Sequence, residues 1–478
     1  MAQLPLSHIR VVDTSMVYAG PTCGRILAEL GADVIKVESL QRPEGTRSDR
    51  FIDNDGGARP WNRGGYFMKR NMGKRGITLN LTDSRGQALY KRLVAKSDIV
   101  IESYTPRVMR NFGLHYEVLS EINPGLIMIS LSGFGQDGPY RDTAAYGMGL
   151  EPMSGLSSLT GYEGDAPLRS GMSYTDPLSG TMGALAVLFA VEHRRRTGEG
   201  QYIDLSEWEA SLPFVGEALL AAQITGDSPG RHGNHRADMA PHNTYPTLGE
   251  DRWVTIAVRS EEQWAPFCRV LGRDGWADDP DLANLAGRKR RERELDDVIA
   301  SWTATRDAWE VTRELQAAGI AAGPVLRPDE VVFDPHLAAR GFFEVIDQPE
   351  AGVRPFPRQL VARFSGMDAG VSRPAPRLGE HNREVLQELL GVGDEQFAEF
   401  WGDEVIGDTP ILQRPRDPVA LEMYLQRDAL TAIDPDFRDK IRHHFHIAED
   451  RLSDPAGLAS ETAEPASPPP APNGEHAR

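Results

Sequence analysis

A short stretch around Asp176 carries the residues best suited to chemistry. Residues 169–180 are Arg-Ser-Gly-Met-Ser-Tyr-Thr-Asp-Pro-Leu-Ser-Gly, and an apolar helical run follows, ending at Arg194-Arg195-Arg196-Thr197-Gly198. Asp before Pro is typical of a helix N-cap, and basic residues before Gly are typical of a helix end. A carboxylate at a helix N-terminus is also favoured in its ionised form, which a nucleophilic carboxylate needs. The spacing therefore leaves two interpretations open, a structural cap and a nucleophile.

Common catalytic signatures are missing from the chain. It contains no GxGxxG after the first strand, no GxxxxGK[ST], no HExxH and no GxSxG, which argues against dinucleotide binding, P-loop chemistry, zinc proteases and α/β-hydrolases. The histidines His443, His444 and His446 are interpreted as a solvated helix face. Cys23 and Cys268 form neither a CxxC pair nor a disulfide framework. We therefore predict no metal site.

The elements that must position Asp176 begin with an alternation of strands and helices. Apolar, β-branched runs predict strands at 9–13, 33–38, 77–81, 99–102 and 126–130, with helical patterns between them. Near-continuous apolar strands of this kind are typical of a parallel sheet covered on both faces. Ligands bind at the carboxyl ends of such strands. The sequence thus predicts an α/β fold with a Rossmann-like large domain but without a nucleotide fingerprint.

Composition shifts along the chain predict five segments. Residues 1–225 form the large domain, 226–330 a smaller α+β domain after a Gly-rich linker, and 331–410 a return segment with a C-terminal helix packing on the large domain. Residues 411–453 are predicted to be a helical extension, because apolar residues recur there at near-helical intervals. Residues 454–478, rich in Pro, Ala, Ser and Glu, are predicted to be a disordered tail.

Composition also restricts partners and compartment. The 478 residues are 40% hydrophobic and 26% charged, with 52 Lys+Arg against 70 Asp+Glu and a net charge of -18. That charge repels polyanions, so nucleic acid is not an expected partner. No stretch approaches the roughly 18 apolar residues needed to span a bilayer, and residues 1–10 lack the layout of a secretory signal. We expect a cytoplasmic protein that binds no membrane.

Several short segments, in order between residues 8 and 395, form a more specific pattern. They are Val12-Asp13-Thr14 with Ala19-Gly20-Pro21, the run from Leu30 to Glu38, the run from Ser132 to Tyr140, Thr197-Gly198-Glu199-Gly200-Gln201, Ala322-Gly323-Pro324-Val325, and the run from Asp334 to Arg340. Together they resemble the family III CoA-transferases of the CaiB–BaiF type, and the chain is closely similar to formyl-CoA transferases. The resemblance implies an interlocked homodimer in which the two chains pass through one another.

The resemblance also implies a mechanism for Asp176. In that family, the aspartate at this position attacks the acyl-CoA carbonyl to form a mixed anhydride. It then takes CoA as an aspartyl thioester and passes it to an acceptor carboxylate. Coenzyme A is thus a substrate in thioester form, and no permanently bound cofactor is expected. Each oxyanion needs hydrogen-bond donors, for which the amides of Leu178, Ser179 and Gly180 are candidates because Pro177 has no N–H.

CoA-contacting positions follow from the same resemblance. They fall after the predicted strands, on the following residues: Tyr18, Ala19, Ser39, Leu79, Asn80, Leu81, Thr82, Ser103, Tyr104, Thr105, Asn111 and 144–147, including Tyr146. Formyl-CoA transferases carry basic residues at the positions of Ser39, Thr82, Asn111 and Ala144, so the phosphate contacts differ here. Nearby arginines are candidates to replace them, namely Arg42, Arg47, Arg107 and above all Arg110. The glycine-rich loop of formyl-CoA transferases is not visible in this sequence, and the resemblance implies that residues 230–242 occupy its place.

Two alternatives remain beside CoA transfer between an acyl-CoA and a carboxylic acid. Alpha-methylacyl-CoA racemases resemble this chain but use a His-Asp pair at the positions of Tyr146 and Gly147. Glycine cannot act as a base, and an unperturbed tyrosine titrates near ~10, so transfer is favoured over an acyl-CoA racemase or isomerase. The other alternative is a CoA-binding scaffold without turnover, against which the presence of Asp176 argues.

Overall fold

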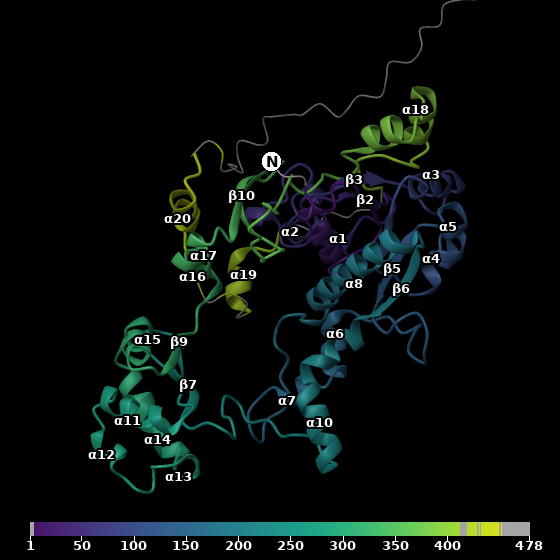
Figure 1. The fold of residues 1–478 in the computed structure, drawn as a ribbon. Helices are drawn as coiled ribbons and strands as arrows, with labels where there is room; N and C mark the ends of the chain where they lie inside the picture. Colours follow the sequence, from purple (N-terminus) through teal and green to yellow (C-terminus); the bar gives the residue numbers. More distant parts are fainter. Residues whose placement is uncertain (1–3, 412–417, 428–429, 431, 449–450, 452–478) are drawn as a thin grey trace, which may run out of the picture. The chain divides into compact units, whose positions relative to one another are not determined.

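The computed structural model describes residues 4–411, 418–427, 430, 432–448 and 451 (Figure 1). The described chain divides into two compact units. The large unit comprises the residues up to 154, 172–214 and those from 338 onward, and the small unit comprises 155–171 and 215–337. The small unit is thus wider than the predicted segment 226–330. The predicted tail 454–478 lies outside the described residues.

The large unit is built on a parallel sheet with the strand order β3-β2-β1-β4-β5-β6 (Figure 1). The order confirms the predicted doubly wound α/β fold, in which the strand order reverses between β1 and β4. Its strands are β1 (Arg10–Asp13), β2 (Asp33–Glu38), β3 (Arg75–Thr78), β4 (Ile99–Glu102), β5 (Ile127–Ser132) and β6 (Gln201–Ser206). The last of these, β6, is absent from the strands predicted above.

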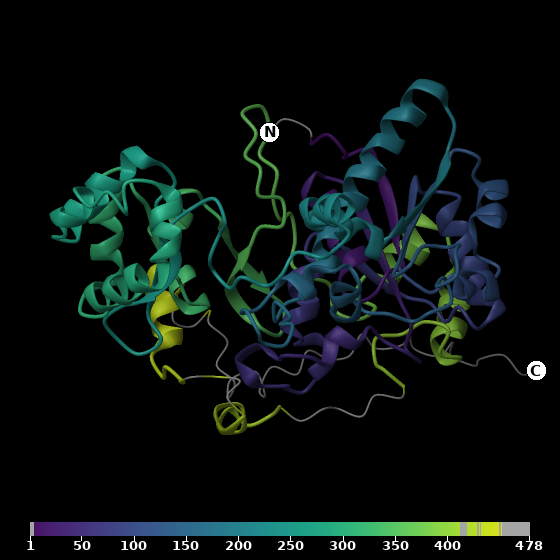
Figure 2. The same cartoon turned by 90° about the horizontal axis from the view of Figure 1, so that it is seen from below.

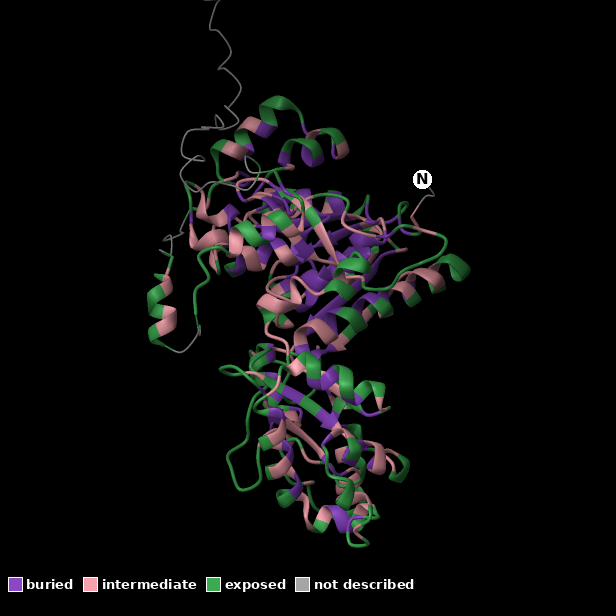
Figure 3. Cartoon of the chain, turned by 90° about the vertical axis from the view of Figure 1, so that its left-hand side faces the viewer, coloured by how far each residue is buried: buried purple, intermediate pink, exposed green. Residues whose placement is uncertain are grey.

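The side chains of successive strand residues pack into two different hydrophobic cores, one on each face of the sheet. Val11 of β1 packs with α1 (Ala19–Glu29) and α8 (Thr175–Thr197) on one face, whereas Val12 packs with α3 (Ser84–Val94) and α5 (Tyr116–Ile122) on the other. Figure 3 shows the strands as largely buried. The helices of the large unit are α1 (Ala19–Glu29), α2 (Gly65–Asn71), α3 (Ser84–Val94), α4 (Arg107–Asn111), α5 (Tyr116–Ile122), α6 (Gly147–Met153), α8 (Thr175–Thr197), α9 (Glu207–Ser211), α18 (Asp394–Gly402), α19 (Leu421–Gln426) and α20 (Phe437–His444).

The small unit is an α+β structure with its own core. Its antiparallel sheet β7-β8-β9 is covered by helices that bury Trp264, Leu295 and Leu315. The elements are α7 (Leu156–Leu159), α10 (Gly216–Thr225), β7 (His242–Pro246), β8 (Trp253–Ala257), α11 (Glu261–Val270), α12 (Asp274–Ala277), α13 (Leu285–Arg290), α14 (Glu292–Thr303), α15 (Ala308–Ala317), β9 (Ala321–Pro324) and α16 (Pro328–Val331), with α17 (Pro335–Ala339) leading back in sequence to the large unit.

Residues beyond 340 close the large unit. The antiparallel pair β10 (Phe343–Gln348) and β11 (Gly352–Pro357) packs on α2 through Phe356, and Phe397 of α18 joins the core under β1. The segment 411–453 contains α19 and α20, the yellow helices of Figures 1 and 2. The Phe445 ring directly after α20 meets the edge of Phe343 at 5.9 Å. None of the described helices combines the length and apolar character needed to cross a membrane.

The contact between α1 and α8 sets the position of the Asp176 segment. A Cβ on Gly180 would lie 2.5 Å from the Ala19 carbonyl oxygen and 2.7 Å from Thr22 Cβ. Only glycine therefore lets the first turns of α1 and α8 approach this closely. As a result, the loop after β1 lies beside the start of α8.

Gly180→Ala is expected to force these two helices apart and lower the free energy of unfolding by about 1–3 kcal/mol, as overpacking does. Thermal and urea unfolding measure the loss. The matched control is Gly149→Ala in α6, where an added Cβ meets nothing within 4 Å. That variant should be neutral or more stable by up to ~1 kcal/mol. Equal stability of the two variants would contradict the close-contact argument.

Candidate active site

Three helix starts meet around Asp176. Gly147 begins α6, Thr175 begins α8, and Glu207 begins α9 directly after β6. These three helices pack against one another within the large unit. The carboxyl end of an outer sheet strand thus delivers a glutamate to the same place as the candidate nucleophile.

Asp176 is not the N-cap of α8. The cap position is Tyr174, no side chain caps the helix, and Asp176 lies in the first turn. The interpretation of Asp176 as a cap is therefore wrong. The carboxylate instead accepts hydrogen bonds from the Ser173 hydroxyl and from the Gly147 amide. The predicted Leu178 donor is also engaged, since its amide donates to the Tyr174 carbonyl at 3.3 Å.

Gly147 closes one side of the Asp176 carboxyl. A Cβ at this position would lie 2.0 Å from Ser173 Oγ and 2.2 Å from Asp176 Oδ2. No side chain fits there, so the site has no room for an acid or base at position 147. The backbone amide takes the place that a side chain would occupy.

Glu207 is the second carboxyl of the site. It is 8% exposed, and its side chain is hydrogen bonded to that of Asp176. Burial and the charge of Asp176 raise the pKa of Glu207 well above its usual range. Burial also raises the pKa of Asp176, although Ser173, Glu207, Arg70 and the Gly147 amide oppose the rise. Burial is thus the largest effect on the pKa of Asp176, contrary to the expectation that the helix dipole and amide donors hold this carboxylate ionised.

The positively charged side chain of Arg70 lies near the Asp176–Glu207 pair. The Arg70 guanidinium is stacked 3.5 Å from the centroid of the Tyr18 ring and 3.6 Å from that of Tyr66. Its charge lowers the pKa of Asp176. Among the described residues, Arg70 Nε and the buried Thr175 Oγ1 have no hydrogen-bond partner. The site therefore contains unused donor capacity and a positive charge, which suit an anionic reactant.

Buried ion pairs fix the loop that carries Tyr18. Lys74 Nζ lies 2.7 Å from Asp13 Oδ2, and Lys36 Nζ lies 2.9 Å from Glu44 Oε2. Glu44 in turn accepts a hydrogen bond from the Val17 amide at 3.2 Å. Val17 has a φ of 67°, which a β-branched residue rarely adopts. Val17, the strained residue directly before Tyr18, is thus held by the carboxylate of Glu44, and the positive charge of Lys36 compensates that carboxylate.

Most of the predicted CoA contacts lie where parallel strands end. Tyr18 and Ala19 follow β1, Ser39 follows β2, the stretch 79–82 follows β3, and 103–105 follows β4. The structure brings Tyr18 to Arg70 near Asp176 and joins Ser103 Oγ to the Met16 amide at 2.9 Å. Along this edge, Asn80, Leu81, Thr82, Tyr104 and Thr105 range from buried to exposed.

Other predicted contacts differ in accessibility. Leu79 is fully buried in the core, so only its main chain could meet a ligand. Arg110 and Asn111 are exposed on α4, and Tyr146, before α6, is 73% exposed. Arg47 cannot serve as a phosphate ligand in this arrangement, because it is buried and ion-paired with Glu38 at 2.7 Å.

Two residues of the site, Glu207 and Arg70, were not identified from the sequence. Glu207 follows the strand that was not predicted, although the alternation in Tyr202-Ile203-Asp204-Leu205 was a usable signal for it. Arg70 lies in the short helix α2 and has no motif around it. Among the described residues, no cluster of His, Cys, Asp and Glu side chains is arranged to hold a metal ion.

The raised pKa of Glu207 predicts a pH-dependent stability difference. A folded-state pKa above the ordinary 4.5 means that stability is fully present below that pH and is lost as the pH rises toward the folded-state pKa. Glu207→Gln removes this loss. The variant should gain unfolding free energy relative to the wild type above pH 4.5, by at most about 1.4 kcal/mol per pH unit.

Urea unfolding between pH 4 and 9 measures this difference. Glu209→Gln, at an exposed position two residues along α9, is the matched control and should follow the wild-type curve. Parallel curves for Glu207→Gln and the wild type would show that Glu207 titrates as an ordinary glutamate.

Comparisons with known proteins agree with the sequence resemblance. The profile of CoA-transferase family III matches residues 6–382. Succinyl-CoA--D-citramalate CoA-transferase of Chloroflexus aurantiacus is 36% identical over 410 residues, which cover 84% of this chain and 98% of the relative. Succinate--glutarate CoA-transferase of Agrobacterium fabrum is 34% identical over 387 residues, covering 80% and 96%. A CAIB/BAIF family protein from Brucella suis superposes with a TM-score of 0.74 at 31% identity, covering 81% of this chain and 100% of that one. The chain is a CoA-transferase and belongs to CoA-transferase family III.

Proposed function

We propose that this enzyme moves CoA from an acyl-CoA donor to a carboxylic acid acceptor, with Asp176 as the nucleophile. The observation that carries the proposal is a carboxylate in the first turn of α8 that caps nothing and is held by Ser173 and the Gly147 amide. Its hydrogen-bonded partner is the buried Glu207, whose pKa is raised well above its usual range by burial and by the charge of Asp176. Asp176 is therefore oriented for attack rather than used to stabilise its own helix.

The proposed reaction consists of acyl transfers that need no net proton. The Asp176 carboxylate attacks the thioester carbonyl carbon, the C–S bond breaks, and CoA thiolate leaves a mixed anhydride behind. The thiolate then attacks the aspartyl carbonyl carbon, which releases the donor acid and forms an aspartyl-CoA thioester. The acceptor carboxylate repeats both steps in reverse. At the end, Asp176 is again a free carboxylate.

Donors for the developing oxyanions are present near Asp176. The Thr175 hydroxyl is buried without a partner, the Gly147 amide already faces the carboxyl, and Arg70 contributes positive charge. Preorganised donors of this kind commonly supply a large part of the rate enhancement in acyl transfer. They replace the Leu178 amide that the sequence suggested.

The substrate class follows from the relatives and from the charge of the site. Their names specify succinyl-CoA or succinate together with D-citramalate, glutarate or mesaconate, which are all dicarboxylic acids. We propose that this enzyme uses succinyl-CoA and a dicarboxylic acid, with CoA lying along the carboxyl ends of β1 to β4. The cation Arg70 near the nucleophile fits substrates with a second negative charge.

Geometry disfavours the racemase alternative. Position 147 has no room for a side chain, and Tyr146 is 73% exposed before α6. A proton abstraction at the α-carbon therefore lacks the base that racemases place here. The scaffold alternative is tested by the experiment below, since a scaffold forms no covalent intermediate.

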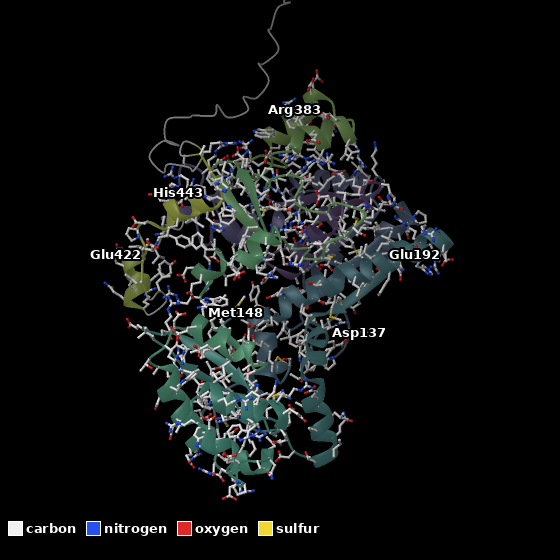
Figure 4. All side chains as sticks on the ribbon, turned by 60° about the vertical axis from the view of Figure 1, so that its left-hand side comes forward. Asp137, Met148, Glu192, Arg383, Glu422 and His443 are labelled. Atoms are coloured by element: carbon white, nitrogen blue, oxygen red, sulfur yellow. The ribbon has the colours of Figure 1, made fainter. Side chains whose placement is uncertain are left out.

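Asp176→Asn is expected to abolish transfer by more than ~10³-fold, because the covalent route loses its nucleophile. Wild type incubated with succinyl-CoA and quenched with hydroxylamine should carry the adduct on Asp176, located by peptide mass spectrometry. The matched control is Asp137→Asn, at an exposed position labelled in Figure 4. Full activity of Asp176→Asn, or wild type without an adduct, would refute the proposed function.

We also propose a homodimer, interlocked as the resemblance implies. On α8, Met182, Leu185 and Phe189 share one helix face, and Phe189 is 67% exposed. On α10 of the small unit, Leu220 and Ile224 are exposed one turn apart. Monomers rarely expose apolar side chains in such groups, so a second copy of this chain is a suitable cover.

The interlocked dimer should keep its mass on dilution to nanomolar concentration, because its chains are linked topologically. Sedimentation velocity of the wild type measures this. Glu192→Ala, at an exposed position of α8 that pairs with Arg195 at 2.7 Å, is the control and should leave the mass unchanged (Figure 4). A stable, active monomer at that dilution would disprove the interlocked arrangement.

A further inference from the structure

The Glu207 carboxyl does not cap its own helix. Glu207 is the first residue of α9, but the cap of that helix is Ser206, whose hydroxyl accepts a hydrogen bond from the Glu209 amide at 3.2 Å. The Glu207 side chain is buried and is directed instead to Asp176. Burial of a carboxyl that neither caps its helix nor forms an ion pair is costly unless it serves another group.

The surroundings determine which carboxyl of the pair holds the proton. Asp176 receives hydrogen bonds from the Ser173 hydroxyl and the Gly147 amide, and Arg70 adds a favourable charge. For Glu207, the interaction found is the one with Asp176 itself. Two hydrogen-bonded carboxyls do not both ionise in a buried site, so Asp176, which has the additional donors and the charge of Arg70, is the anion and Glu207 is the acid.

We infer that Glu207 is a second catalytic residue, a neutral acid that keeps its proton through the cycle and stabilises negative charge on the Asp176 carbonyl oxygen. The inference rests on the proposed function. In the resting enzyme, the Glu207 O–H donates to the Asp176 carboxylate. In the anhydride and the thioester, it donates to the carbonyl oxygen of the same side chain.

In this role, Glu207 assists attack at the aspartyl carbonyl carbon but not attack at the acyl carbon of the substrate. When CoA thiolate or the acceptor carboxylate attacks the aspartyl carbonyl carbon, an electron pair moves onto the Asp176 oxygen, and the Glu207 hydrogen bond strengthens. The C=O bond re-forms as the leaving group departs, and the proton stays on Glu207. When attack occurs at the substrate's acyl carbon, the oxyanion forms on the substrate and other donors must stabilise it. Loss of Glu207 therefore slows formation of aspartyl-CoA more than formation of the anhydride.

Rapid-quench mass spectrometry of the intact protein with succinyl-CoA alone tests the inference. The anhydride adds a succinyl mass and the thioester adds a CoA mass. In Glu207→Ala, thioester formation should slow by about 10²–10³-fold, as for loss of one oxyanion donor, and the succinyl adduct should accumulate. Glu207→Gln keeps a neutral donor and should form the thioester within about tenfold of the wild-type rate, since a neutral hydrogen bond contributes ~1 kcal/mol. Glu209→Gln should match the wild type.

Two results would overturn the inference. One is a wild-type rate of thioester formation in Glu207→Ala, and the other is a loss in Glu207→Gln as large as in Glu207→Ala, which would mean that the ionised carboxylate is required. A wild type that forms no adduct at all would refute the proposed function instead.

An infrared measurement on folded protein is independent of the alanine variant. The difference spectrum of wild type minus Glu207→Gln at neutral pH should contain the carbonyl band of a protonated carboxylic acid. A spectrum with only carboxylate bands would contradict the neutral acid.

Discussion

The site depends on two buried ion pairs that hold the loop after β1 in place. Asp13, Lys74, Lys36 and Glu44 are all buried, and each charge has an opposite partner within 3 Å. Burial alone would raise the pKa of Asp13, but Lys74 and Lys36 outweigh it and lower the pKa. Breaking such a pair by removing one partner costs about 3–5 kcal/mol, because the other charge stays buried. The loop is therefore rigid where it passes the start of α8.

Rigidity of that loop matters because the proposed chemistry needs a buried carboxylate. A helix terminus and hydrogen-bond donors favour ionised Asp176, yet burial in this site is the larger effect. In the arrangement that we infer, the second carboxyl, Glu207, takes up a proton, so that the two acids together carry a single negative charge. Close approaches at Gly147 and Gly180 make this packing possible, since a side chain at either position would displace the helices that hold the pair.

The sequence predicted those parts of the fold that local pattern determines. Strands β1, β2, β4 and β5 are buried on both faces, and their apolar runs are visible without tertiary information. In contrast, β6 has partly exposed positions along most of its length and was missed, together with Glu207 after it. Asp176 was recognised from its motif, but its partners were not, because contacts among α6, α8 and α9 arise from packing. Arg47 was taken as a candidate phosphate ligand because its pairing with Glu38 is a tertiary contact too.

Residues that are synthesised late complete a core that begins at the first strand of the sheet. The core that contains Val12, Val100 and Met128 is completed by Val385, Phe397 and Ile406, near the other end of the sequence. On the ribosome, the part of this sheet face that α3 and α5 do not cover thus stays exposed until the whole of the small unit has emerged. Exposed apolar sheet surface in an incomplete domain promotes aggregation. The incomplete large unit therefore exposes apolar surface while the small unit is being synthesised, and chaperones that hold unfolded chains are suited to bind such a surface.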